Sequence, residues 1–182
     1  QFLKTQGSGA NPVWSTVSTG AYNIAQYNEQ ALSQVTSTSN NYSVRMGTNE
    51  ITVTPSATTD LIELNLFMSV EGSTSSTSYF GFGVQFSTSS GSYSTSIAAS
   101  NYLVHTGEHS FSNGSSSVDN RYRYVGFTIK KTAANFGLSA GTTYYLSAHG
   151  TTHSNSNATH KFAYNPTHAT GHNSFSLIRY TV

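Results

Sequence analysis

Large apolar residues alternate with other residues along most of this sequence, and a helical spacing of apolar residues is almost absent. In residues 61–70 every second residue is large and apolar: Ile62, Leu64, Leu66, Met68 and Val70. Successive side chains of a β-strand point to opposite faces, so this spacing predicts a strand with one buried face. The intervening positions mix Leu61 and Phe67 with polar residues, which predicts that the other face is half buried.

Shorter segments with the same spacing recur from residue 21 onward. The predicted strands are residues 21–27, 42–46, 51–53, 61–70, 79–86, 101–105, 122–130, 142–148, 160–164 and 174–181. Clusters of Ser, Thr, Gly and Asn indicate loops at residues 72–78, 87–92, 107–117 and 150–157. Short strands joined by turns, without crossover helices, are typical of an all-β antiparallel sandwich or jelly roll rather than a parallel sheet.

Two segments add detail to this prediction. Residues 79–86 alternate aromatic with small residues, which suits a strand packed closely against a neighbouring backbone. Residues 28–35 are the one stretch with the composition of a helical turn, because Glu29, Gln30, Ala31 and Leu32 are good helix formers. We expect at most this one helical turn in a chain that is otherwise all β.

The predicted sheets must face water with very few charges. Charged residues make up 8% of the chain, whereas 31 Ser, 25 Thr and 15 Asn supply uncharged polar side chains. Disordered chains combine few aromatic residues with high net charge, so an aromatic content of 13% and a net charge of +1 predict a folded domain. Charges on edge strands commonly prevent edge-to-edge pairing. Their scarcity predicts an obligate oligomer, in which identical neighbours cover the edges and apolar faces.

The composition also excludes several classes of protein. Eight Lys and Arg scattered among seven Asp and Glu form no basic stripe, so nucleic acid is not expected as a partner. No apolar run approaches the roughly 20 residues that cross a bilayer, so membrane insertion is not expected. The absence of cysteine excludes disulfides and thiolate sites. The chain begins at Gln1 without a signal peptide, and we expect it to be part of a longer polypeptide.

Three short segments, at residues 1–14, 51–62 and 173–182, carry distinctive sequence patterns. The opening QFLKTQGSG, followed by NPVW, is similar to a short repeat unit of tail fibres and other phage appendages. ITVTPSATTDLI at residues 51–62 resembles a strand-turn-strand of a jelly-roll domain that is frequent in marine phage virion proteins. NSFSLIRYTV at residues 173–182 is similar to the last strand of that domain. The chain departs from the pattern at Asp60, where Lys is usual, and in five histidines between residues 149 and 172.

The resemblance implies a non-enzymatic domain near the end of a viral fibre or spike. Residues 1–20 would form a stalk-like segment, and residues 21–182 a jelly-roll sandwich of the TNF/C1q-like kind that assembles as a homotrimer. The implied function is attachment of a tail fibre or other external appendage of the virion to a host surface receptor, glycan or protein. The alternative is a decoration or cement protein that stabilises the phage head. Either role implies contacts with other virion proteins.

The seven histidines raise the question of a metal site. Three pairs have i, i+4 spacing, His105/His109, His149/His153 and His168/His172, and HTGEH at residues 105–109 matches an inverted zincin string. The string contains Gly and precedes a loop, so it does not predict a helix, and on a strand such pairs lie about 13 Å apart at about 3.3 Å per residue. We therefore predict no metal or other cofactor, and histidines that lie on the surface and in loops. The alternative is a metal ion bound on a threefold axis by one His from each of three chains.

Enzyme chemistry lacks a specific signal in this sequence. Glycoside hydrolysis needs a pair of carboxyl groups, and Asp60 and Glu63 are close in sequence but are better explained as strand-edge charges. No Gly-x-Ser-x-Gly elbow and no Gly-rich phosphate loop followed by Lys is present. We predict that the chain is not an enzyme.

Aromatic residues in uncharged polar loops are the best candidates for receptor contacts. A ring offers a flat apolar surface to a sugar or protein, and Tyr adds a hydroxyl. The predicted receptor-binding residues are Tyr93, Tyr102, His153, Tyr164 and His168. Most other Tyr residues are expected to pack in strands or at a subunit interface, and Trp14 to anchor the stalk.

Overall fold

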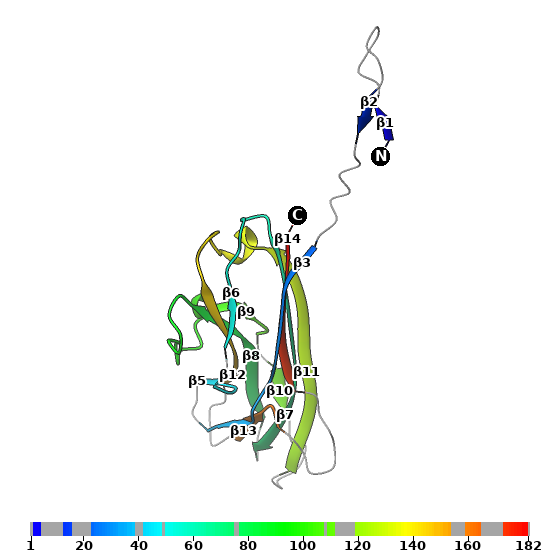
Figure 1. Cartoon of the computed structure of the whole chain (residues 1–182). Helices are drawn as coiled ribbons and strands as arrows, with labels where there is room; N and C mark the ends of the chain where they lie inside the picture. Colours follow the sequence, from blue (N-terminus) through cyan, green and yellow to red (C-terminus); the bar gives the residue numbers. More distant parts are fainter. Residues whose placement is uncertain are drawn as a thin grey trace.

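The computed structural model describes residues 2–4, 13–15, 23–38, 42–48, 50–74, 77–107, 109–111, 119–153, 159–164 and 173–181. Strands dominate this part of the chain, and none of these residues lies in an α-helix. Two antiparallel sheets pack face to face as a β-sandwich, which confirms the predicted fold class (Figure 1). A separate hairpin pairs β1 (Phe2–Lys4) with β2 (Val13–Ser15). The division into a stalk and a sandwich domain stays a prediction.

The first sheet, called the β7 sheet, is built around its longest inner strand. Its strands are β3 (Asn23–Ala31), β4 (Val35–Ser37), β7 (Leu61–Thr74), β11 (Asp119–Thr132), β13 (Thr159–Phe162) and β14 (Ser174–Thr181). β11 pairs with β7 along its whole length, and β14 and β13 share the other side of β7. β3 then pairs with β14, and β4 with β13, so β11 forms one edge of the sheet.

The second sheet, called the β8 sheet, has two inner strands. Its strands are β5 (Tyr42–Arg45), β6 (Ile51–Val53), β8 (Ser78–Ser87), β9 (Tyr102–His105), β10 (His109–Phe111) and β12 (Tyr144–Thr152). β8 pairs with β12, β9 and β10 flank β8, and β5 and β6 flank β12. Two short 3-10 turns, η1 (Ala99–Asn101) and η2 (Ala134–Phe136), lie in the connections.

The core lies between the two sheets and confirms the alternation seen in the sequence. The five alternating apolar residues of β7 are at most 1% exposed. They belong to one core cluster with equally buried side chains from both sheets: Phe80, Phe82, Val84, Leu146, Phe162, Phe175 and Leu177. Burial of this many apolar side chains is the main stabilising contribution to such a fold.

The predicted close approach of residues 79–86 to a neighbouring backbone is also confirmed. β9 passes so near to β8 that a Cβ added at Gly83 would collide with the carbonyl oxygen of Val104 and lie 2.9 Å from the Tyr102 ring. A Cβ at Gly81 would lie 2.8 Å from Thr151 Oγ1. The two glycines therefore leave room for side chains on the outer face of the β8 sheet.

Residues 28–31, in the one stretch with the composition of a helical turn, belong to β3, because β3 pairs with β14 over almost its whole length and this pairing overrides helix propensity. Strands also extend into predicted loops: β7 runs to Thr74, β12 to Thr152, and β10 lies within residues 107–117. The Ser and Thr residues of these segments are compatible with strands as well as with turns.

The interpretation of Asp60 and Glu63 as strand-edge charges is wrong as well. Both lie at or on β7, which is an inner strand with partners on both sides. Asp60 is 2% exposed and forms an ion pair of 2.9 Å with Arg179, while Glu63 pairs with Lys130 at 3.6 Å. Both carboxylates are held in cross-strand ion pairs within the chain.

Candidate functional site

The outer face of the β8 sheet is covered by the connection between β8 and β9. Gln85 on β8 anchors this connection, because its side chain donates to the carbonyl oxygen of Ser94 and accepts from the Ser94 amide, both at 3.0 Å. The amide of Ser43 on β5 donates to Thr95 O at 2.8 Å. Side chains that point outward from the sheet are therefore buried: Ser43, Gln85, Ser147, His149 and Thr151 are each at most 3% exposed. A polar layer lies where a solvent-facing surface would be expected.

Ser43 is the centre of this layer. Its Oγ accepts hydrogen bonds from Tyr102 Oη at 2.7 Å and from Gln85 Nε2 at 3.0 Å, and it lies 3.0 Å from Nδ1 of His149. A hydroxyl accepts two hydrogen bonds and donates one, so with both acceptor positions used the Ser43 hydrogen points to His149 Nδ1. Nδ1 is then an acceptor, and the neutral imidazole carries its proton on Nε2.

His149 therefore presents a buried donor. Its residue exposure is 2%, and burial together with the nearby Arg45 charge lowers the pKa of His149 to about 3. Its Nε2 has no hydrogen-bond partner among the described residues. A buried donor left without a partner costs about 1–3 kcal/mol. An acceptor atom of a ligand would remove this cost.

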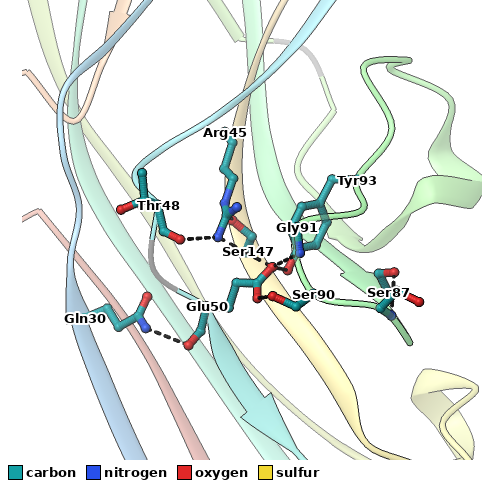
Figure 2. A network of polar contacts seen from close by, with 10 residues as sticks. Gln30, Arg45, Thr48, Glu50, Ser87, Ser90, Gly91, Tyr93 and Ser147 are labelled. Carbon is teal, nitrogen blue, oxygen red and sulfur yellow. Dashed lines mark hydrogen bonds and ion pairs between the residues drawn. The ribbon is translucent and has the colours of Figure 1, made fainter.

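Arg45, Glu50 and Tyr93 form a network (Figure 2), and the centre of the Tyr93 ring lies 5.2 Å from that of His149. Glu50 accepts from Tyr93 Oη at 2.7 Å, from the Gly91 amide at 2.6 Å and from Ser90 Oγ at 2.5 Å. Arg45 lies 3.5 Å from the Glu50 carboxylate, and its guanidinium lies 5.0 Å from the centre of the Tyr93 ring. The Tyr93 ring is thus held at both its hydroxyl and its face.

The protonation states in this network follow from burial and hydrogen bonding. Burial first, and then the hydrogen bond to Glu50, raise the pKa of Tyr93, so it is a neutral phenol at physiological pH. Burial would raise the pKa of Glu50, but the hydrogen bonds from Ser90, Gly91 and Tyr93 outweigh it and the pKa is lowered. The Arg45 and Glu50 charges therefore compensate each other.

A pocket of about 360 Å³ opens between this network and the connection. Tyr93, Ser94, Thr95, Ser43, Arg45 and His149 contribute to its wall, together with Val35, Val44 and Gly91. The wall combines one aromatic ring, several hydroxyl groups and the His149 imidazole, and none of the described wall residues is acidic. Such a pocket suits an uncharged ligand rich in hydroxyl groups.

A second group of rings adjoins the pocket. The Tyr102 and His105 rings are 4.7 Å apart, and those of His105 and His153 are 6.1 Å apart. Thr151 Oγ1 lies 2.9 Å from His153 Nε2 and 3.5 Å from His105 Nε2. Burial, and then the charges of His153 and His109, lower the pKa of His105. No group of three or more metal-ligating side chains occurs within the described ranges.

The predicted histidine pairs do not form helical motifs. His105 ends β9 and His109 begins β10. His109 pairs with Phe80 across the ladder and faces the core, whereas His105 pairs with Gly83 and faces outward. His149 and His160 are 2% and 0% exposed, so the prediction of surface and loop histidines is wrong for these two. His172 and His168 lie outside the described residues.

The structure brings three of the five predicted receptor-binding residues together. Tyr93, Tyr102 and His153 all lie on the outer side of the β8 sheet. Tyr164 lies elsewhere, stacked on Tyr122 of the β7 sheet with ring centres 5.5 Å apart. His168 lies outside the described residues.

Arg45, Glu50 and His149 were missed as site residues. They come from β5, from the residue before β6 and from β12, and no local motif links them. The alternation along residues 144–152 places Ser147, His149 and Thr151 on one face, which was the available signal. Their burial depends on the connection between β8 and β9 that folds over them, and no local sequence pattern predicted that contact.

No protein-family model, curated protein sequence or solved structure matches this chain. Within the described residues, no helix is long and apolar enough to span a membrane. The function is therefore inferred from the geometry of the site and from the sequence.

Proposed function

We propose that this chain is a receptor-binding domain at the distal end of a virion appendage, such as a phage tail fibre, and that it attaches to a glycan on the host surface without cleaving it. The observation that carries the proposal is the pocket beside Tyr93, with its held ring and the Nε2–H of His149, which has no partner in the described part of the chain. The sequence resemblance to phage appendages supports the setting. The β-sandwich is compatible with the jelly-roll domains to which these segments are similar.

The chemistry of the pocket favours a neutral sugar. The Tyr93 ring offers a flat apolar face to the C–H groups of a pyranose, and His149 Nε2–H offers a donor to a ring or hydroxyl oxygen. Arg45 is balanced by Glu50, so the pocket has little net charge to attract an ion. Glycoside hydrolysis needs two carboxyl groups across the scissile bond, and no acidic residue is among the wall residues that the structure describes.

Replacing Tyr93 by Ala is expected to weaken glycan binding at least about tenfold, because burying an aromatic ring contributes about 1.5–3 kcal/mol. The measurement is binding to an array of neutral oligosaccharides, followed by adsorption of the domain to candidate host cells. Tyr79→Ala is the matched control, because Tyr79 is an exposed residue of β8 that does not line the pocket. Equal losses in the two variants would contradict the proposal. A domain that coats stripped capsids but binds no cell would favour the decoration role.

The proposal includes a homotrimer, supported by an apolar surface on the β7 sheet. By strand register, five of the six exposed large hydrophobic residues described lie on the outer face of that sheet: Ile24, Tyr27, Phe67, Tyr122 and Tyr124. Large apolar side chains that are exposed on one face of a sheet are typical of interaction sites. Three identical chains would also multiply weak glycan contacts through avidity.

Light scattering of the purified chain is expected to give three times the chain mass of 19.5 kDa. The double variant Tyr122→Ser/Tyr124→Ser is expected to shift the mass toward a monomer, because both side chains are more than half exposed in the single chain and lie on this face. A wild-type monomer at micromolar concentration would contradict the trimer. It would leave the glycan pocket, which lies on the other sheet, to be tested separately.

A further inference from the structure

A second cavity lies at an open side of the sandwich, where β9 and β10 of one sheet face β11 of the other. Its volume is about 520 Å³, within the range of small-ligand sites, and its wall includes Phe82, His109, Arg123, Tyr124 and Val125. It shares no wall residue with the pocket beside Tyr93. We call it the interlayer cleft.

His109 contributes a buried nitrogen to the interlayer cleft. Its ring is stacked on both Phe80 and Phe82, with ring centres 5.4 Å apart in each case. Its Nε2 is buried and has no hydrogen-bond partner within the described part of the chain. Burial, and then the Arg123 charge, lower the pKa of His109. The ring is therefore a neutral imidazole with one nitrogen left for a ligand.

Arg123 contributes a positive charge that no described carboxylate offsets. It pairs with Val70 in the β11–β7 ladder, which places its side chain on the inner side of the sheet, and its guanidinium lies 5.4 Å from the centre of the Phe111 ring. Four other cations are each paired with a carboxylate: Arg45, Lys130, Lys161 and Arg179. Among the described residues, Arg123 is thus a cation without an ion-pair partner, and it lies beside an apolar wall.

We propose that the interlayer cleft binds the carboxylate of an acidic sugar, with Arg123 as ion-pair partner and His109 donating from Nε2. A single carboxylate matches the single charge of Arg123, and a guanidinium holds a carboxylate with two parallel hydrogen bonds. Phe82 and Val125 provide apolar wall for the sugar ring, and Thr106 is a further wall residue beside it. This site is separate from the neutral-sugar pocket and does not depend on it.

The test is a titration of the intact chain with D-glucuronate, and with D-glucose as the matched neutral sugar, followed by NMR of the histidine ring nitrogens. Glucuronate is expected to shift the His109 signals, and glucose is expected to leave them unchanged. Arg123→Gln is expected to weaken glucuronate binding at least about tenfold, because it removes a charge-assisted hydrogen-bond pair. Lys131→Gln is the matched control, since Lys131 is an exposed cation on the same face of β11 outside the cleft.

A second variant separates binding from folding. His109→Phe keeps an aromatic ring between Phe80 and Phe82 but removes Nε2, so it is expected to retain the fold, checked by circular dichroism, and to weaken glucuronate binding. Binding that is unchanged in Arg123→Gln, or equal shifts with glucose or with acetate, would overturn the proposal. Tyr93→Ala is expected to bind glucuronate normally, so this site and the neutral-sugar pocket can fail independently.

Discussion

Lowering the pH from 7 to 4 is expected to destabilise this fold by several kcal/mol, because two histidines are buried in the neutral form. His160 is 0% exposed and lies between Ser78 Oγ, 3.0 Å from Nε2, and Thr152 Oγ1, 3.2 Å from Nδ1. Burial lowers the pKa of His160 to about 4, as it lowers that of His149 to about 3. In the unfolded chain both would titrate at about 6.5.

The direction of the effect follows from proton counts. Between about pH 6.5 and 4 the unfolded chain binds two protons at these histidines that the folded chain does not bind. The free energy of unfolding therefore falls as the pH falls, by up to about 1.4 kcal/mol per pH unit for each histidine. His105 and His109, whose pKa values are also lowered, act in the same direction.

Urea unfolding at intervals from pH 8 to 4 measures this effect. The variant His160→Gln retains a side chain that can hydrogen-bond to Ser78 and Thr152. It is expected to reduce the dependence of the unfolding free energy on pH by the contribution of about one proton. A free energy of unfolding that stays constant between pH 6.5 and 4, in wild type and variant alike, would contradict the burial of neutral imidazoles.

Replacing Asp60 by Ala is expected to cost about 3–5 kcal/mol, which is a large part of the 5–15 kcal/mol typical of a folded domain. Asp60 Oδ2 accepts from the Ser56 amide at 2.7 Å, from Ser56 Oγ at 2.9 Å and from Arg179 Nη1 at 2.9 Å. It thereby joins the start of β7 to β14. Its loss leaves the largely buried Arg179 guanidinium without a counter-charge. The Nε of Arg179 already has no hydrogen-bond partner among the described residues.

The acid behaviour of Asp60 differs from that of the histidines. Burial would raise its pKa, but the hydrogen bonds from Ser56 and Arg179 outweigh it and the pKa of Asp60 is lowered. The stabilisation is therefore complete above the unfolded value of about 4 and is lost as the pH falls through the lower folded value. This loss begins only below about pH 4, whereas the effect of the histidines begins at about pH 6.5.

Chemical unfolding of Asp60→Ala at pH 7 tests the prediction, with Glu63→Ala as control. Glu63 pairs with Lys130 at 3.6 Å and both side chains are partly exposed, so its loss is expected to cost about 1 kcal/mol or less. Adding Arg179→Met to Asp60→Ala is expected to recover part of the stability by removing the uncompensated charge. Equal losses from Asp60→Ala and Glu63→Ala would contradict the buried ion pair.

The strand pattern was readable from the sequence because it is a local property. The alternation of residues 61–70 predicted which face of β7 is buried, and the small residues at positions 81 and 83 predicted a close neighbour. The composition of residues 28–35 left a helical turn open, and the pairing of β3 with β14 decided in favour of a strand over residues 28–31. Short strands such as β10 were missed because Ser and Asn signal turns wherever they cluster.

The sequence by itself determined that this chain forms an antiparallel sandwich with few charges and that Tyr93, Tyr102 and His153 deserve testing as receptor contacts. Only the tertiary structure decided that these three share one face with His149, and that Asp60 meets Arg179 across 119 residues of chain. The physical reason is range: side-chain alternation repeats every two residues. The burial of His149 depends on the connection that folds over it, and the pairing of Asp60 depends on which distant strand lies beside it. Both contacts join segments that are far apart in the sequence.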